Sequence, residues 1–161
     1  MKNYLVIGNP IDHSLSPQIH NYWIKKNNIS AVYDKQKLTN DSLKDLILRI
    51  KEKKIDGINV TVPFKKIIIK YLDVLSPEAE GTQSVNTIYL ENEKIVGHNT
   101  DIFGFEFAIK NTNFDVSNKK IFILGAGGVV SSIIFALKKM KVSEITLTNR
   151  TKNKAENLKK L

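Results

Sequence analysis

The sequence predicts an α/β fold built from two units of unequal size. Two observations carry this prediction: short apolar runs end in Gly, Pro or Asn, as buried strands do, and the segments between them repeat hydrophobic residues at helical spacing. A polar stretch then separates a first strand–helix series from a second one. We therefore expect an α/β unit at residues 1–110, a linker at 111–118 and the first part of another unit at 119–161.

The first unit alternates strands with helices. Residues 4–8 form an apolar run that ends in Gly-Asn-Pro, and Ser16-Pro17 has the form of a helix N-cap followed by proline. Asn40 or Asp41 can cap a further helix, in which hydrophobic residues recur at helical spacing. The expected strands are 4–8, 31–38 and 55–62, and the expected helices are 16–26, one after residue 41 and a short one after Pro63.

The pattern changes at residues 87–98, where two short runs, TIYL and KIVGH, are separated by Glu-Asn-Glu. This is a hairpin signal, and we expect the hairpin at an edge of the sheet. A helix at 101–111 then leads out of the first unit. In the second unit we expect a strand at 120–124, a helix at 127–140, a strand at 145–148 and a terminal helix.

Composition narrows the functional classes. The net charge is +9, but the lysines are scattered and lack the interleaved aromatic residues of a stacking surface, so a nucleic-acid partner is not expected. No apolar run approaches the roughly 20 residues of a membrane span, and the N-terminal run is too short for a signal peptide. The absence of cysteine excludes disulfides and thiolate metal sites and agrees with a cytoplasmic protein. No metal site is predicted.

A glycine-rich turn opens the second unit. The run IFILGAGGV puts Gly125, Ala126, Gly127, Gly128 and Val129 between a strand and a helix. There the backbone can approach a pyrophosphate, and the helix N-terminus favours its negative charge. The third glycine position of the strict G-x-G-x-x-G pattern holds a valine instead. The context indicates the first part of a Rossmann-type dinucleotide-binding unit.

The residues after the second strand of this unit favour NADP. An acidic residue selects NAD at this place, whereas the chain has Arg150, whose guanidinium can hold a 2′-phosphate through two hydrogen bonds. Lys154 adds charge one helical turn later, and Asn149 and Thr151 complete the candidate cofactor set. The alternative is that the glycines only form a tight turn and that Arg150 is a solvated surface charge. The joint occurrence of the glycine-rich turn and of Arg150 after the second strand favours NADP binding over this alternative.

Hydroxyl, amide and charged side chains gather at the strand ends of the first unit, where ligands of open α/β sheets bind. Two serines flank a helix N-terminus, which suits a carboxylate, and the others suit hydroxyl groups. Each of them has an alternative role as a helix cap or a backbone partner. The residues alone therefore predict a small polar ligand. The candidates are Ser14, Ser16, Asn59, Thr61, Lys65, Asn86 and Asp101.

Taken as a set, six motifs resemble the shikimate dehydrogenase family in order and in spacing over the whole chain. They are SLSP at 14–17, NVTVPFK at 59–65, SVNT at 84–87, NTDIFG at 99–104, GAGG at 125–128 and NRTKNKA at 149–155. The resemblance implies reversible reduction of 3-dehydroshikimate to shikimate with NADPH, in the pathway to chorismate and the aromatic amino acids. The chain departs from the family at Gln83-Ser84, where Gly-Ala is usual, and at Ile102-Phe103.

The resemblance also implies residue roles. The two serines would hold the substrate carboxylate, and Asn59, Thr61, Asn86 and Asp101 would hold its ring hydroxyls. Lys65, paired with Asp101, would be the acid/base at the carbonyl that accepts the hydride. An ammonium beside that oxygen can stabilise the developing alkoxide and deliver a proton.

The second unit has only two expected strands, whereas a complete dinucleotide-binding unit has about six. We therefore expect activity to need C-terminal residues absent from this chain, supplied by a longer product or by a partner. Two alternatives stay open. One is a quinate/shikimate dehydrogenase, against which Arg150 argues because such enzymes often prefer NAD. The other is a non-catalytic ligand-binding remnant. The oligomeric state is not predicted.

Overall fold

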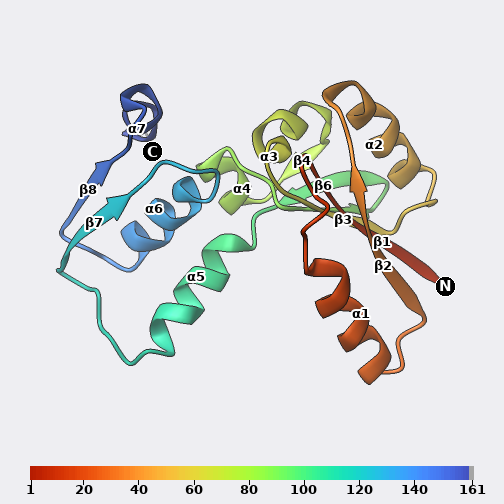
Figure 1. Cartoon of the computed structure of the whole chain (residues 1–161), viewed down its shortest axis with the longest axis horizontal. Helices are drawn as coiled ribbons and strands as arrows, with labels where there is room; N and C mark the ends of the chain where they lie inside the picture. Colours follow the sequence, from red (N-terminus) through yellow and green to blue (C-terminus); the bar gives the residue numbers. More distant parts are fainter. Residues whose placement is uncertain (160–161) are drawn as a thin grey trace.

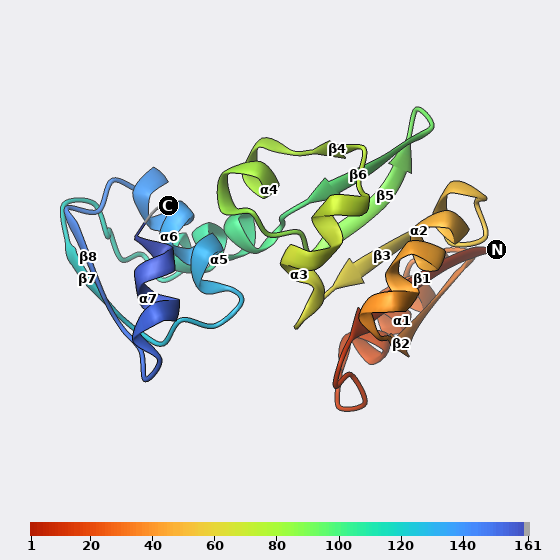
Figure 2. The same ribbon diagram turned by 90° about the horizontal axis from the view of Figure 1, so that it is seen from above.

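The computed structural model describes residues 1–159 and has two lobes, each built around its own sheet (Figures 1 and 2). The larger lobe holds a six-stranded mixed sheet with the order β2-β1-β3-β5-β6-β4, which confirms the α/β class. Its strands are β1 (Lys2–Gly8), β2 (Ala31–Lys37), β3 (Gly57–Val60), β4 (Val74–Leu75), β5 (Thr87–Glu91) and β6 (Lys94–His98).

Helices pack on both faces of this sheet, because successive side chains of a strand point to opposite faces. Ile7 of β1 packs into the larger core with the buried stripe of α2 (Leu43–Lys51), which recurs at helical spacing as predicted. Val6 faces the other side and packs in the cluster that includes Ile24 of α1 (Ser16–Lys26). The remaining helical segments of this lobe are η1 (Asn40–Ser42), α3 (Phe64–Ile67), η2 (Ile68–Tyr71) and α4 (Pro77–Thr82).

The predicted edge position of the hairpin is wrong. β5 pairs with β3, and β6 pairs in parallel with the two-residue β4, which takes the edge of the sheet. The sequence did not predict β4, because two residues carry no detectable periodicity. It also did not predict α4, whose N-cap Ser76 accepts the Ala79 N–H at 3.2 Å.

One predicted helix cap is wrong, and one departure from the family pattern falls at a helix end. Ser16 is the first residue of α1 and not its N-cap; Leu15 holds that position, and Ser14 Oγ accepts the Ser16 N–H at 3.3 Å. Gln83, which stands where the family usually has glycine, ends α4 with a φ of 48°. Glycine is favoured at such left-handed helix ends because it has no Cβ. The departure at Gln83 therefore falls on a backbone position that strains other residues.

The smaller lobe has the predicted strand–helix–strand order. It consists of β7 (Lys120–Leu124), α6 (Val130–Lys139), β8 (Glu144–Thr148) and α7 (Lys152–Leu158), with β7 and β8 paired in parallel. α6 begins at residue 130 and not 127, because the glycine turn occupies the residues before it. The last two residues of the expected unit, 160–161, lie outside the described residues.

The two faces of the β7–β8 sheet differ in coverage. On one face, Ile123 packs in a cluster with Val130 and Ile134 of α6 and Leu158 of α7. On the opposite face Phe122 is 64% exposed, and Leu124 at the strand end is 82% exposed. The smaller lobe therefore buries one side of its sheet and leaves large apolar side chains open on the other.

The two lobes touch through helices. α5 (Asp101–Lys110) runs from the first lobe to the second and packs against α6 (Figure 1). α4 also contacts α6, at a point where a Cβ on Gly81 would lie 2.5 Å from a ring carbon of Phe135. Lys139 Nζ lies 3.3 Å from the buried Glu106 Oε1. Within residues 1–159, none of the helices is both long and apolar enough to cross a membrane.

Candidate functional site

An ion pair between Lys65 and Asp101 lies at the centre of the candidate site. Lys65 is the second residue of α3, shortly after β3 ends, and Asp101 is the first residue of α5. Lys65 Nζ lies 2.7 Å from Asp101 Oδ2, and the two side chains are 14% and 23% exposed. The pair is shielded from most of the solvent, which strengthens its electrostatic interaction, and a small ligand can still reach it.

Asn86 orients this carboxylate. Its amide nitrogen donates to Asp101 Oδ1 at 2.7 Å and to Thr100 Oγ1 at 2.9 Å, so both amide hydrogens are engaged. Asn86 Oδ1 accepts the Thr100 N–H at 3.0 Å and the Thr87 hydroxyl at 2.9 Å. Asp101 therefore has one oxygen held by Asn86 and the other by Lys65, which fixes the plane of the carboxylate.

Asn59 extends this network towards β2. Its amide nitrogen donates to Thr87 Oγ1 at 3.2 Å and to the Asn86 carbonyl at 3.3 Å, and its Oδ1 accepts the Tyr33 hydroxyl at 2.6 Å. Burial raises the pKa of Tyr33 to about 12. Because the phenol keeps its proton throughout the neutral range, it always presents a donor to Asn59. The orientation of the Asn59 amide is therefore fixed from both ends.

The predicted serines and Thr61 lie on the segments that follow β1 and β3, which end at the same edge of the sheet. β1 and β3 are parallel neighbours, so their carboxyl ends coincide. A Cβ on Gly8 would lie 2.7 Å from the Thr61 methyl carbon, so glycine at the end of β1 lets the two loops approach closely. Ser14 lies on the loop after β1, Ser16 begins α1 directly after that loop, and both are half-buried. The site thus has a hydrogen-bonded centre around Lys65 and further hydroxyls beside it.

The glycine turn of the second lobe has free space in front of its backbone. Gly125 has a φ of 110°, and its N–H donates to the Thr148 carbonyl at 2.7 Å, which joins the ends of β7 and β8. A Cβ built on Gly125 or Gly127 would meet no atom within 4 Å. A phosphate needs such access to backbone N–H groups at the start of a helix. The turn therefore fits a dinucleotide.

Asn149 ties this turn to the loop after β8. Its Oδ1 accepts the Ala126 N–H at 3.1 Å, and its amide donates to the Thr151 carbonyl at 2.8 Å. Arg150 follows in the same loop, and Lys154 lies in the first turn of α7; both are exposed. Asn149 thus connects the glycine turn to the loop after β8. The charged groups of Arg150 and Lys154 are accessible to an anionic ligand.

The glycine turn approaches the strand end of the first lobe. A Cβ on Gly128 would lie 3.4 Å from Val62 Cγ2, at van der Waals distance. Val62 belongs to the NVTVPFK segment and precedes Lys65 by three residues. A ligand on the glycine turn and a ligand at Lys65 would therefore be neighbours.

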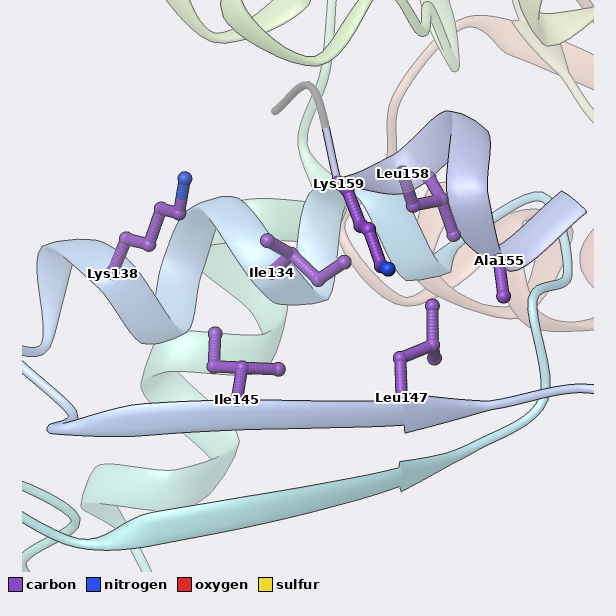
Figure 3. A pocket seen from close by; sticks show the side chains of 7 residues that line it. All are labelled: Ile134, Lys138, Ile145, Leu147, Ala155, Leu158 and Lys159. Carbon is purple, nitrogen blue, oxygen red and sulfur yellow. The ribbon is translucent and has the colours of Figure 1, made fainter.

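A hollow on the helix side of β8 is separate from this arrangement. It lies between α6, α7 and β8, and its apolar side chains point towards one another (Figure 3). The lining residues are Ile134, Lys138, Ile145, Leu147, Ala155, Leu158 and Lys159. Because this lining is mainly aliphatic, lies over the sheet face and includes no residue of the glycine turn, we assign it to the loosely filled core of the second lobe.

Sequence reasoning missed four polar residues of the site: Tyr33, Thr87, Asn99 and Thr100. Two Asn-Thr pairs, at 86–87 and 99–100, bracket the hairpin, and this repetition is a signal that could have shown both threonines. The same repetition marks Asn99, but Tyr33 could not be found in this way. Tyr33 lies on a strand far from Asn59 in sequence, and the partners of the Asn99 amide nitrogen, on α4 and α6, are likewise not visible from the sequence.

The fold and the site together define a class. A sheet edge with a lysine–carboxylate pair is followed by a Rossmann-type strand–turn–helix with basic residues after its second strand. Within residues 1–159, no group of His, Cys, Asp and Glu side chains is arranged to hold a metal ion. This is the class of two-domain α/β proteins of the dinucleotide-binding type.

Family models identify the family within this class. A model described as the shikimate dehydrogenase substrate binding domain matches residues 6–88. Another, described as shikimate / quinate 5-dehydrogenase, matches residues 106–161. The chain belongs to the shikimate dehydrogenase family, as its six motifs predicted.

Individual relatives agree with this assignment. A shikimate dehydrogenase (NADP(+)) of Pelagibacter ubique (strain HTCC1062) is 60% identical over 159 residues, which cover 99% of this chain and 60% of that protein. The crystal structure of shikimate dehydrogenase from Aquifex aeolicus is 41% identical with a TM-score of 0.92, over 99% of this chain and 60% of that one. A Thermus thermophilus structure, in complex with NADP(H) and shikimate, is 29% identical with a TM-score of 0.88, over 99% and 60%. The chain thus spans about 60% of the length of these relatives.

Proposed function

We propose that this chain carries the substrate-binding unit and the first part of the NADP-binding unit of an enzyme that reversibly reduces 3-dehydroshikimate to shikimate. The observation that carries the proposal is the 2.7 Å ion pair of Lys65 and Asp101, which Asn86 orients beside the glycine turn. The name of the Pelagibacter ubique relative and the shikimate-bound Thermus thermophilus structure support the same reaction. We further propose that turnover requires the C-terminal segment that these relatives possess.

Lys65 is the proposed acid/base. The chemistry that NADPH would supply when bound is a hydride for the substrate carbonyl carbon, and the carbonyl oxygen would then carry negative charge. The Lys65 ammonium stabilises that charge and donates a proton to it, and in the oxidative direction the same nitrogen takes the proton back. Asp101 holds the ammonium in place through the oxygen opposite the one bound by Asn86. Because the two groups interact so closely, we assign the proton transfer to the pair.

The remaining candidates are proposed to hold the rest of the substrate. The Ser14 and Ser16 hydroxyls would bind its carboxylate, and Thr61, Asn59 and Asn86 its ring hydroxyls. The amide groups of Asn59 and Asn86 are already engaged in the network. Within residues 1–159 the Asn59 oxygen accepts only the Tyr33 hydroxyl, so it has a lone pair left for a ring hydroxyl. A ring hydroxyl at Asn86 has to displace a partner, which must then bond to the ligand itself, because a buried polar group left unpaired is costly.

NADP is the proposed cofactor. The free space before Gly125 and Gly127 suits the pyrophosphate, and the exposed Arg150 and Lys154 suit the 2′-phosphate. The names of the relatives support this choice. We place this small-molecule reaction in the cytoplasm, as the sequence led us to expect.

The decisive test replaces Lys65 by methionine, which keeps the length of the side chain and removes its charge. The protein is assayed as the chain itself and as the chain completed with the C-terminal remainder of the Pelagibacter ubique relative. We expect Lys65→Met to lower kcat for shikimate oxidation by on the order of 10² to 10⁴, the range for loss of a general acid/base. A kcat of Lys65→Met equal to that of the unsubstituted protein would contradict the proposal.

Lys66→Met provides the matched control for this experiment. Lys66 is adjacent and exposed, so its substitution removes the same charge from the same helix without touching Asp101. We expect it to leave kcat within about twofold of the unsubstituted protein, the scale of a surface substitution. Equal losses in both variants would point to general charge effects instead of acid/base chemistry.

Arg150 separates the proposed enzyme from a quinate/shikimate dehydrogenase that uses NAD. Arg150→Ala should weaken binding of NADP⁺ about tenfold to hundredfold, the scale of a charged hydrogen bond, and leave NAD⁺ binding nearly unchanged. Both nucleotides are titrated calorimetrically, and turnover of the completed protein is compared on shikimate and quinate. Equal or better rates with NAD⁺ and quinate would favour the rival enzyme.

The third possibility, a ligand-binding remnant, concerns the chain as it stands. Calorimetric titration of residues 1–161 with shikimate is run beside a turnover assay. Turnover rejects the remnant, and binding without turnover supports it for the isolated chain. Turnover that appears only on completion supports the proposed function together with its need for the C-terminal segment.

A further inference from the structure

Asn99 is a buried polar residue with partners in both lobes. It is 1% exposed and lies between β6 and α5, two residues before Asp101. Its Oδ1 accepts the Asp101 backbone N–H at 3.1 Å. Its amide nitrogen donates to Thr82 Oγ1 of α4 at 3.0 Å and to Ser132 Oγ of α6 at 2.9 Å. One side chain therefore joins the start of α5 to the helix that follows the glycine turn.

The direction of these bonds matters for the acid/base pair. The Asp101 N–H belongs to the first turn of α5, where backbone donors have no partner within the helix. Asn99 supplies that partner, so the backbone of Asp101 is held from one side and its carboxylate from the other by Asn86. Loss of the Asn99 contact would leave the Asp101 side chain anchored but its backbone free to move.

Ser132 supplies one of two hydroxyl groups that orient the Asn99 amide. Its hydroxyl is fully buried and takes one of the two amide hydrogens, and Thr82 takes the other. The neighbouring Ser131 is also buried, yet its Oγ has no hydrogen-bond partner within residues 1–159. Two adjacent serines of α6 therefore differ in one respect: only Ser132 is tied to the segment that carries Asp101.

We propose that Asn99 is a positioning residue for the Lys65–Asp101 pair, and that Ser132 connects it to α6 so that the placement of the pair depends on how the nucleotide-binding turn is seated. The catalytic consequence rests on the proposed function. The mechanical link does not, because it concerns only how Asp101 is held. A ligand that shifts the start of α6 would move the partner of Asn99 and thereby the backbone of Asp101.

The test compares Ser132→Ala with Ser131→Ala, two identical substitutions one residue apart. The first arm measures hydrogen exchange of the Asp101 amide by NMR in the full 161-residue chain. Ser132→Ala should accelerate exchange of this amide about tenfold, the effect of weakening one hydrogen bond, and Ser131→Ala should leave it unchanged. Equal exchange in the two variants overturns the link, whatever the chain catalyses.

The second arm measures kinetics in the completed protein. Ser132→Ala should lower kcat about tenfold with KM for shikimate within about twofold, because positioning is lost and ground-state binding is kept. Ser131→Ala should change neither constant. Faster Asp101 exchange with unchanged kcat would overturn the catalytic part of the inference. Absence of turnover in the unsubstituted completed protein would instead count against the proposed function, and the exchange arm would still decide the link.

Urea unfolding of both variants controls for stability. A structural role alone would lower the unfolding midpoint of Ser132→Ala and leave kcat per folded molecule unchanged, which contradicts the proposal. Asn99→Ala extends the series, because it removes all three contacts at once and should reduce kcat by about a further tenfold. The conclusion depends on the comparison of Ser132→Ala with Ser131→Ala, because each substitution removes only a hydroxyl and leaves the Asn99 amide in place.

Discussion

The two lobes of this chain differ in how completely each covers its own sheet. In the first lobe, Ile7 and Val6 of β1 pack into different hydrophobic clusters, so helices cover both faces of the sheet. In the second lobe, α6 and α7 cover one face of β7 and β8, while Phe122 and Leu124 of β7 remain mostly exposed. The first lobe therefore buries both faces of its sheet, whereas the second lobe buries only one face of its sheet.

This contrast separates what each lobe contributes to the site. The hydrogen-bonded network from Tyr33 to Lys65 depends on long-range contacts, which only a packed sheet can hold in register. The glycine turn and the Arg150 loop depend on adjacent segments, joined by Asn149 and by the pairing of β7 with β8. The glycine turn can thus form on two strands, whereas the Lys65–Asp101 ion pair depends on contacts across the first lobe.

The largest expected effect compares isoleucines of the two cores. Ile50 of α2 is fully buried in the first core, and Ile134 of α6 lines the hollow of the second. Ile50→Ala should lower the free energy of unfolding by about 3–4 kcal/mol, because it leaves a cavity in a closed core. Ile134→Ala should cost about 2 kcal/mol or less, since its surroundings are already open. Urea unfolding followed by circular dichroism measures both, and equal losses would show that the second core is as tightly packed as the first.

A second, intermediate effect concerns the contact between the lobes. Gly81→Ala puts a methyl group 2.5 Å from a ring carbon of Phe135 in α6, so the ring or the helix has to shift. We expect a loss of about 1–3 kcal/mol, typical of overpacking.

Gly104→Ala is the matched control for this second prediction. Its Cβ on α5 meets no atom within 4 Å, so the variant should gain about 0.5–1 kcal/mol from helix propensity. Thermal melting distinguishes the opposite signs. A stabilising Gly81→Ala would mean that Phe135 moves freely and that α4 and α6 are only loosely joined.

The smallest effect concerns Tyr33 and reports on the first lobe alone. Its pKa is raised to about 12 by burial, above the ordinary value of 10. Its contribution to stability is therefore fully present below pH 10 and is lost as the pH rises towards 12. Ultraviolet titration should show one late tyrosinate component that Tyr33→Phe abolishes. At neutral pH the variant should lose about 1 kcal/mol, for the hydrogen bond to Asn59. A Tyr33 that ionises with its ordinary pKa would indicate a looser first lobe than the burial implies.

Much of the fold could be predicted because its signals are local. The boundaries of β7 coincide with the predicted strand at 120–124, and the stripe of α2 is visible at helical spacing. β4 and the interior position of the hairpin could not be predicted, because strand order depends on contacts between distant segments. Local pattern thus identifies elements more readily than it places them.

The candidate site shows the same division. Asn86, Lys65 and Asp101 were selected one by one from element ends and the family resemblance, and the structure brings them into direct contact. Nothing in the sequence reveals that Asn99 bonds to Ser132 across the lobes, since that contact depends on how α6 lies against α4 and α5. The residues that could be predicted have side chains typical of a catalytic or binding role. The contact that could not be predicted, between Asn99 and Ser132, helps to hold the backbone around Asp101 in position.

The close approach of Gly128 to Val62 sets a limit on how the lobes can move. A Cβ at position 128 would lie 3.4 Å from Val62 Cγ2, so the gap between the turn and the strand end is about as wide as one methyl group in ordinary van der Waals contact. A branched residue at position 128 would place further side-chain atoms between the turn and Val62. These atoms would hold the lobes apart even with every polar group of the site intact. A residue no larger than alanine at position 128 is therefore a steric condition for the present approach of the two lobes, in addition to what the glycine does for a phosphate.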